Sequence, residues 1–215
     1  TLFRSEMNLY DFATAPSPRR VRIFLAEKGV DVPRVPVDLR AGEQFQPPFR
    51  GHNPLCTVPY LELDDGSGIG EVVAICRYLE EMYPQPALFG TDAKSRGLIA
   101  MWDHRVEVEG MMAVAEALRN AAPFFKGHAL PGPHGFEQIP ELANRGRARV
   151  QIFFDMLNER LLHHEFVAGD TFSIADITAL VAVEFARVVK AAVPDEHTSL
   201  KRWHAAISAR PSAQA

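Results

Sequence analysis

The sequence predicts an α/β domain followed by an all-α domain. Short β-rich runs alternate with amphipathic helical segments in residues 7–84, which gives the element order βαβ–ββα. A proline-containing segment at 85–91 interrupts this pattern and is incompatible with a continuing helix. Residues 92–215 then show helical periodicity alone. We therefore expect two domains, 7–84 and 92–215, joined by a linker at 85–91.

The first half of the α/β domain reads as a βαβ unit. Residues 9–12 alternate as a strand, and Ser17 as N-cap with Pro18 at the first helical position predicts the start of a helix. Gly29 is a typical helix end. A second strand is expected at 35–38, with the right-handed crossover that such units adopt.

The second half of this domain begins after a predicted loop over residues 40–54. A strand at 60–63 is followed by the turn-forming residues 64–68 and by a short strand at 69–70. A helix over 71–82 closes the domain. This arrangement predicts a hairpin that delivers the chain directly into a helix.

The second domain contains three clear helical segments and one helix-start motif. Ser173 and Asp176 have the spacing of a capping box, with a carboxylate in place of the usual Glu. We expect this motif to serve folding and not chemistry. The helical segments are 92–120, 137–164 and 199–209.

Composition excludes several function classes. The 215 residues are 47% hydrophobic and 23% charged, with a net charge of −4, which gives no electrostatic reason to expect nucleic acid or an anionic membrane as partner. No run reaches the roughly 18 apolar residues of a membrane span. The two cysteines form no disulfide framework, which predicts a cytoplasmic protein. The eight histidines show no zinc-binding spacing, so no metal is expected.

One motif points to peptide binding. Val58-Pro59 opens the strand at 60–63, where proline is tolerated only at the first residue or in a tight turn because it has no N–H. A cis bond here turns the backbone N–H and C=O of Val58 away from the sheet, free to pair with an extended peptide. Glu71 lies at the start of the next helix. The sequence therefore predicts a ligand site made by a strand edge and a helix N-terminus.

Three runs, NPLCTVPYLELDDG, GEVVAICRYLEEMYP and VAGDTFSIADITAL, resemble the glutathione S-transferase family in order and spacing. The resemblance extends over nearly the whole chain. It implies the glutathione transferase fold, with a thioredoxin-like N-terminal domain and an all-α C-terminal domain. It also implies glutathione as co-substrate and a homodimer as the assembly.

The resemblance assigns roles in glutathione binding. It implies that the backbone at Val58 and Pro59 holds the cysteinyl part and that Glu71 with its successor holds the γ-glutamyl end. Most of the family has Ser after the acidic residue, whereas this chain has Val72, which offers only its backbone N–H. Gln44 matches a position near the glycyl carboxylate, with a solvated loop side chain as the alternative.

Glutathione chemistry requires a thiolate, and an ordinary thiol has a pKa of about 8.5. Lowering this pKa by about two units requires about 2.7 kcal/mol of preferential stabilisation. A helix N-terminus contributes about 0.3–1 kcal/mol, or up to about 2 kcal/mol when partly buried. A hydrogen bond to a charged acceptor adds about 1.5–3 kcal/mol, so we expect at least one donor besides the helix that begins near Ser17.

The usual donor is missing from its expected position. Many transferases place Ser or Cys at the end of the first strand, and the matching residue here is Ala15. The neighbouring hydroxyls belong to Thr14 and Ser17, and we predict Ser17 as a catalytic candidate, with simple helix capping as the alternative. Tyr10 lies within the strand, and the alternation leaves its direction open.

The complete pattern most resembles an atypical fungal and bacterial branch of the family. That branch lacks the usual Ser, Tyr or Cys and activates the thiol through a water held by a Ser and a His one turn apart. Counting from Arg105, the matching positions are Ala115 and Arg119, and neither keeps the residue type. Arg119 can still donate to a thiolate or a water, with Asn120 as a second candidate. The alternative is an arginine that only stabilises a helix end.

The predicted function is glutathione transfer to small hydrophobic electrophiles in a detoxifying role. One alternative is a glutathione-dependent disulfide reductase or peroxidase, for which Cys56 is conceivable as a mixed-disulfide site; Cys76 reads as core. Another alternative is a non-catalytic glutathione-binding protein, because Ala15 replaces the usual donor and Val72 replaces the usual Ser.

Overall fold

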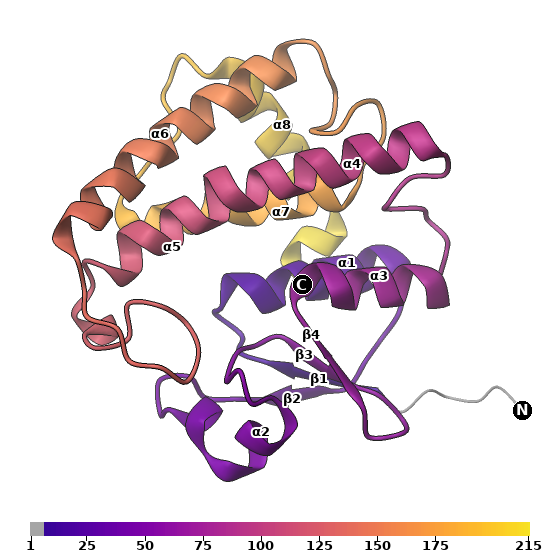
Figure 1. Ribbon diagram of the computed structural model, residues 1–215. Coiled ribbons are helices and arrows are strands. Elements are labelled where there is room, and N and C mark those ends of the chain that lie inside the picture. The colour runs from indigo at the N-terminus through magenta and orange to yellow at the C-terminus, as the bar shows by residue number, and fades with distance from the viewer. Residues whose placement is uncertain (1–6) are drawn as a thin grey trace, which may run out of the picture. The chain divides into compact units, whose positions relative to one another are not determined.

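The computed structural model describes residues 7–215 and comprises two compact units (Figure 1). The first unit ends at Pro86 and the second begins at Ala87, within the predicted linker. Residues Pro131–His134, although they come from the second half of the chain, belong with the first unit.

The first unit contains a four-stranded mixed sheet. The strand order is β2-β1-β3-β4, in which β1 pairs in parallel with β2 and antiparallel with β3, and β3 pairs antiparallel with β4. The predicted βαβ–ββα order is therefore confirmed. The strands are β1 (Asn8–Asp11), β2 (Arg34–Pro36), β3 (Tyr60–Glu62) and β4 (Gly68–Gly70).

Helices cover both faces of this sheet. Figure 1 shows α1 (Pro16–Lys28) and α3 (Val72–Met82) on one face and α2 (Pro47–His52) on the other. A set of apolar side chains from the sheet and from α1 and α3 is fully buried and forms the core of this unit. The largest of them are Leu9, Ile23, Phe24, Leu61, Ile75 and Leu79.

The prediction of an unstructured loop at 40–54 is wrong. This segment contains the 3-10 turn η1 (Glu43–Phe45) and the six-residue helix α2. Pro47 and Pro48 occupy the first two helical positions, where a missing N–H costs nothing. Periodicity reveals little over six residues, so the two prolines were the available signal.

The second unit is helical, as predicted (Figure 1). Its helix α7 is buried along nearly its whole length, which makes it the centre of the core. The α-helices are α4 (Ala93–Val106), α5 (Met112–Arg119), α6 (Pro140–Leu162), α7 (Ile174–Phe185) and α8 (Thr198–Ser208). The remaining turns of helix are η2 (Glu107–Met111), η3 (Pro123–Phe125), η4 (Ala186–Val189) and η5 (Pro211–Gln214).

The segment predicted as one helix over 92–120 is interrupted by the π-helical turn η2. Arg149 of α6 donates from Nη2 to the carbonyl oxygen of Val108 at 2.6 Å, so this carbonyl has a partner from outside its own helix. Gly110 in the same turn faces the Phe153 ring, whose Cζ would lie 2.6 Å from an added Cβ. Because these contacts come from a distant helix, the local periodicity did not predict the π turn.

The capping box at the start of α7 is confirmed. Asp176 Oδ2 accepts from the Ser173 N–H at 3.1 Å and from its hydroxyl at 3.3 Å. The other oxygen, Oδ1, accepts from the Val167 N–H at 2.9 Å and from Trp203 Nε1 at 3.0 Å. One buried carboxylate therefore ties the preceding loop, the helix start and α8 together.

Helices α5 and α6 pack so closely that one position requires glycine. A Cβ at Gly146 would lie 2.6 Å from the Ala117 nitrogen and 2.8 Å from the Ala113 oxygen, both backbone atoms that have little freedom to move. We expect Gly146→Ala to lower the free energy of unfolding by about 1–3 kcal/mol through overpacking. Urea denaturation measures this change.

Gly97 provides the matched control for that substitution. It lies in the exposed part of α4, and no atom lies within 4 Å of an added Cβ. Gly97→Ala is expected to raise the free energy of unfolding by about 0.5–1 kcal/mol, because alanine is the better helix former. Equal effects at the two positions would contradict the packing argument.

None of the helices in residues 7–215 combines the length and apolarity that a membrane span requires.

Candidate active site

The strand registers bring the predicted glutathione-binding residues to one end of the sheet. Tyr60 of β3 pairs with Gly70 of β4 and with Tyr10 of β1. Since these pairs are antiparallel, the residue before Tyr60 and the residue after Gly70 leave the sheet at the same end. Pro59 and Glu71 therefore lie at the end where β1 passes into the turn before α1.

A side-chain-bonded turn precedes Val58. The buried Asn53 donates from Nδ2 to the Thr57 carbonyl oxygen at 2.8 Å and accepts the Leu55 N–H at 3.1 Å. Cys56 within this turn has a left-handed backbone, with φ of 55°. The Val58–Pro59 bond that follows is cis, as predicted. Val58 itself precedes β3 and so presents its backbone groups at the end of the sheet.

Glu71 has an unusual backbone for a residue with a side chain. It is the N-cap of α3, with φ of 66° and ψ of 130°, and its exposed side chain makes no cap hydrogen bond. Such a conformation costs on the order of 1–3 kcal/mol and concentrates at functional sites. The first helical bond of α3 runs from the Ile75 N–H to the Glu71 carbonyl, so the N–H of Val72 has no partner within the helix.

A buried ion pair fixes the turn between β1 and α1. Arg22 donates from Nη1 to Asp11 Oδ1 at 2.6 Å and from Nη2 to the Ala13 carbonyl oxygen at 2.9 Å. Burial lowers the pKa of the Arg22 guanidinium, and the adjacent Asp11 carboxylate opposes that shift. Removing either charge leaves the other buried without its partner, which is costly.

The prediction that Ser17 caps α1 is wrong. The N-cap is Ala15, with φ of −80° and ψ of 137°, and Pro16 is the first helical residue. A residue before proline is driven into this extended region, so the Ala15-Pro16 step sets the helix start and overrides the capping preference of serine. Ser17 is the second residue of the helix.

This start leaves Ser17 as the main donor at the helix N-terminus. Pro16 and Pro18 on either side of it have no N–H, so among the first three helical residues only Ser17 has one. Arg20, whose side chain is almost fully buried, donates from Nη2 to Ser17 Oγ at 3.4 Å. Because the serine oxygen accepts from a cation, its O–H hydrogen can point toward another acceptor.

Gln44 lies in η1, beyond the end of β2. Its Oε1 is buried and has no hydrogen-bond partner within the described residues. Buried polar atoms in folded proteins nearly always have a partner, so this oxygen is an acceptor with unmet hydrogen-bonding capacity. The side chain is therefore not simply solvated.

The two predicted donors of the second unit have partners there. Arg119 donates from Nε to the Ala129 carbonyl oxygen at 3.1 Å and from Nη2 to the His128 carbonyl oxygen at 2.7 Å. Asn120 is buried and accepts the Ile139 N–H at 2.9 Å. Partial burial lowers the pKa of the Arg119 guanidinium. A direct role of these residues in thiol activation stays a prediction.

Family models match both parts of the chain. Residues 14–82 match the glutathione S-transferase N-terminal domain, and residues 111–211 match the C-terminal domain. The chain belongs to the glutathione S-transferase family. The predicted family, fold and enzyme class are thereby confirmed.

Relatives from yeast and bacteria agree with the predicted branch of the family. Glutathione S-transferase 2 of Saccharomyces cerevisiae is 36% identical over 212 residues, covering 97% of this chain and 88% of the yeast protein. A glutathione S-transferase domain-containing protein of Marinobacter aquaeolei has 39% identity and a TM-score of 0.89, covering 95% of this chain and 98% of its own. The structure of Gtt2 from Saccharomyces cerevisiae has 35% identity and a TM-score of 0.88, with coverages of 96% and 98%.

Sequence reasoning did not single out two buried side chains of this candidate site, Arg20 and Asn53. An Asn-Pro step is a known turn initiator, so Asn53 was detectable in principle. Arg20 is buried to 3% exposure although arginine is normally at the surface. It stands in the basic segment Arg19–Arg22, so no local pattern signalled its burial.

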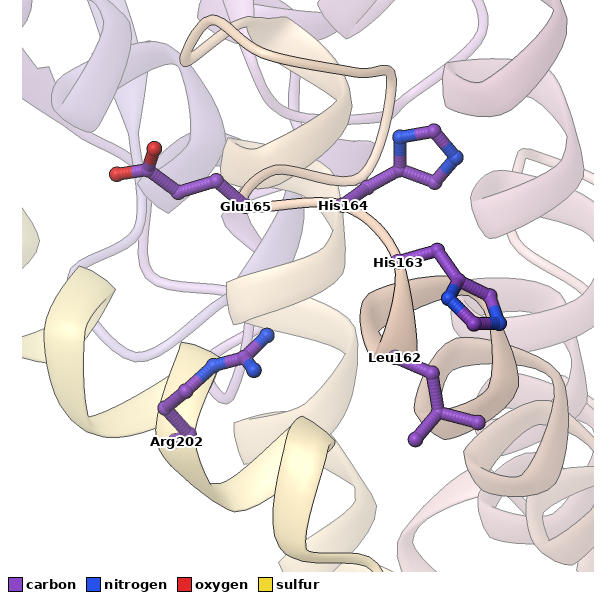
Figure 2. A pocket seen from close by; sticks show the side chains of 5 residues that line it. All are labelled: Leu162, His163, His164, Glu165 and Arg202. Carbon is purple, nitrogen blue, oxygen red and sulfur yellow. The ribbon is translucent and has the colours of Figure 1, made fainter.

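A depression in the second unit contains none of the predicted site residues. It is lined by Leu162, His163, His164 and Glu165, at and just after the C-terminal end of α6, and by Arg202 of α8 (Figure 2). Arg202 donates to the Leu161 carbonyl oxygen at 2.6 Å and so satisfies the end of that helix. Across residues 7–215 no group of three or more His, Cys, Asp or Glu side chains is placed to hold a metal ion.

Proposed function

We propose that the protein binds glutathione at the end of the sheet in its first unit and transfers the thiolate to small hydrophobic electrophiles. The observation that favours this function most is the strained Glu71 at the start of α3, on the same end of the sheet as Val58 and Pro59. The family relation supports a homodimer, a cytoplasmic location and a detoxifying role as parts of the same proposal.

The tripeptide has charges that suit the two ends of this site. Its γ-glutamyl end bears an ammonium and a carboxylate; Glu71 would pair with the ammonium, and the Val72 N–H at the start of α3 would bind the carboxylate. The backbone of Val58 would pair with the cysteinyl part as an added strand does. Gln44 would donate from Nε2 to the glycyl carboxylate.

Ser17 is the proposed thiolate donor. The N-terminus of α1 contributes about 0.3–1 kcal/mol, or up to about 2 kcal/mol in a partly buried setting, toward the roughly 2.7 kcal/mol needed. A hydroxyl donating to a thiolate adds about 1.5–3 kcal/mol, which closes this gap. The hydrogen bond from Arg20 to Ser17 Oγ supports this orientation of the hydroxyl.

A second candidate function is glutathione binding without turnover, which the alanine at position 15 favours. No observation favours the reductase or peroxidase alternative to the same degree. Cys56 is buried, and its thiol donates to the Pro54 carbonyl oxygen at 3.5 Å.

Binding and turnover are tested together. We expect retention on immobilised glutathione and conjugation of a chloronitroarene. Ser17→Ala is expected to raise the pKa of the bound thiol by about 1–2 units, read from thiolate absorbance, while retention persists. Thr14→Ala, which removes an exposed neighbouring hydroxyl, is the matched control and is expected to leave that pKa unchanged.

The outcomes separate the candidate functions. Retention without turnover would favour the binding protein, and absence of retention would overturn both candidates. An unchanged thiol pKa in Ser17→Ala would remove Ser17 from the mechanism without affecting the binding proposal.

A further inference from the structure

The face of the sheet opposite α1 and α3 carries two cross-strand pairs of side chains. Asn8 of β1 lies opposite Glu62 of β3, and Tyr10 lies opposite Tyr60. Side chains alternate along a strand, and Leu9, between the two β1 residues, is fully buried in the core. The four paired residues therefore point to the face that α2 covers, so Tyr10 is directed toward α2 and not toward the α1 layer (Figure 1).

The short helix α2 packs on this face through ring side chains. Phe49 is buried, and its ring centroid lies 5.5 Å from that of Tyr10 and 6.4 Å from that of Tyr60. His52 is the last residue of α2, and its ring centroid lies 5.2 Å from that of Tyr10. A helix of six residues is too short to be stable by itself, so the position of α2 depends on its contacts with the sheet.

The Glu62 carboxylate links β1, β3 and α2. Its Oε2 accepts from Asn8 Nδ2 at 3.3 Å and from the Tyr10 hydroxyl at 3.4 Å. Burial, and after it the Glu62 charge, raises the pKa of the Tyr10 hydroxyl, so this hydroxyl remains protonated and donates. The other oxygen, Oε1, accepts from His52 Nδ1 at 3.2 Å. The sheet therefore holds one oxygen of the carboxylate and the end of α2 binds the other.

Helix α2 connects two parts of the proposed glutathione site. Gln46 is the N-cap of the helix, two positions after Gln44 in η1. At the other end, the Asn53 N–H donates to the Phe49 carbonyl oxygen at 2.8 Å, and Asn53 then forms the turn that precedes Val58. A displacement of α2 from the sheet would therefore move Gln44 and the start of the Val58 segment together.

We propose that His52 and Glu62 are positioning residues for glutathione binding. Their hydrogen bond keeps the C-terminal end of α2 on the sheet, and α2 in turn holds Gln44 and the turn before Val58 in place for one tripeptide. This inference rests on the proposed function and assigns neither residue a contact with glutathione. Loss of the hydrogen bond lowers the fraction of molecules that have α2 in place and weakens the apparent affinity for glutathione by that fraction.

The first test removes the donor of this hydrogen bond. His52→Ala is expected to raise KM for glutathione about fourfold, while kcat and the pKa of the bound thiol stay unchanged. His52→Asn, whose amide places an N–H near the position of Nδ1, is expected to keep KM within about twofold of the unaltered protein.

The second test measures the release of α2 without reference to activity. Arg50 is an exposed residue of α2, so trypsin cleavage after it reports local opening of this helix. Cleavage is expected to be about two- to threefold faster in His52→Ala. Added glutathione is expected to slow it in both proteins, because ligand binding and helix docking favour each other.

A double-mutant cycle identifies the partner of His52. Glu62→Ala is expected to raise KM about fourfold or more, and adding His52→Ala to it should raise KM no further, because both changes remove the same hydrogen bond. A further fourfold rise, by about the factor seen for His52→Ala alone, would show independent effects and overturn the proposed pair. His163→Ala is the matched control, because His163 is also an exposed histidine at a helix C-terminus, and it should leave KM and cleavage unchanged.

The remaining outcomes separate positioning from direct binding. A raised KM in His52→Ala with unchanged cleavage would overturn the positioning role in favour of contact between His52 and glutathione. Faster cleavage with unchanged KM would overturn it as well, because release of α2 would then not affect binding. Absence of glutathione binding by the unaltered protein would overturn the proposed function, whereas cleavage after Arg50 would still report whether His52 holds α2, so the two failures are distinguishable.

Discussion

Replacing Asp176 with alanine is expected to lower the free energy of unfolding by about 4 kcal/mol or more. The carboxylate accepts four hydrogen bonds from buried groups, and each donor left without a partner costs about 1–3 kcal/mol. Since small proteins have a total stability of about 5–15 kcal/mol, this change removes much of the margin. Urea denaturation of purified protein measures it, and Asp176→Asn, which keeps the size, is the milder variant.

The loss of folding stability caused by Asp176→Asn should be larger at acidic pH than at neutral pH. Burial raises the pKa of the Asp176 carboxyl to about 6, and the hydrogen bonds from Val167, Trp203 and Ser173 only partly oppose that rise. Because the folded state then binds the proton more tightly than the unfolded chain, this contribution to stability is complete below about pH 4 and is lost as pH rises through about 6. We expect the stability difference between the two proteins to be about 2 kcal/mol larger at pH 4.5 than at pH 7.5.

Asp170→Asn is the control for both measurements. Asp170 is exposed and lies six residues away, so the same chemical change there should shift stability by less than about 0.5 kcal/mol. A difference for Asp176→Asn that grows with pH would show that the carboxylate, not the protonated acid, is the stabilising form. That result would refute the desolvation argument.

Features of the fold that depend on residues close in the sequence were predictable, and features that depend on distant residues were not. The hairpin, the capping box and the order of elements depend on neighbouring residues, and all were predictable. The start of α1 also depends on neighbouring residues, but there the conformational restriction before proline and the capping preference of serine favour different start positions. The restriction on Ala15 before Pro16 is steric, whereas a serine cap contributes about 1 kcal/mol, so the steric rule decided the outcome.

Features made by contacts between distant residues were not predictable. The π turn η2 depends on Arg149 reaching Val108, which are 41 positions apart. The partners of Arg119 lie nine and ten residues further along the chain, in a loop without periodicity. The sequence marked Arg119 as a candidate because of its place on a helix, but only the folded loop revealed what its guanidinium binds.

The candidate site shows the same division. The Val58-Pro59 step and the adjoining acidic residue were identified from turn chemistry and resemblance. Their convergence follows from strand register, which the pairing of Tyr60 with Gly70 and Tyr10 provides. The strain at Glu71 was invisible in the sequence, because a glutamate at a helix start is ordinary and favourable.

Glu71→Gln is expected to weaken glutathione binding by about thirtyfold, or about 2 kcal/mol, because the ammonium of the γ-glutamyl group loses its charged partner. The fold should be unaffected, since the Glu71 side chain is exposed and makes no cap hydrogen bond. Calorimetric titration with glutathione measures the affinity. Glu81→Gln changes the same charge at the other end of α3, at an exposed position, and should leave the affinity unchanged.

Glu71→Gly separates strain from ligand binding. A backbone with φ of 66° and ψ of 130° suits glycine, so the substitution removes about 1–3 kcal/mol of strain and loses about 0.5–1 kcal/mol to chain entropy. We expect a protein that is more stable by up to about 2 kcal/mol yet binds glutathione as weakly as Glu71→Gln does. If Glu71→Gly is less stable than the unaltered protein, the claim that the Glu71 backbone is strained is wrong. Unchanged affinity of Glu71→Gln for glutathione would remove the carboxylate from the site. If Glu71→Gly instead gains stability and loses glutathione binding, the protein retains the backbone strain because the ligand requires a charged side chain at this position.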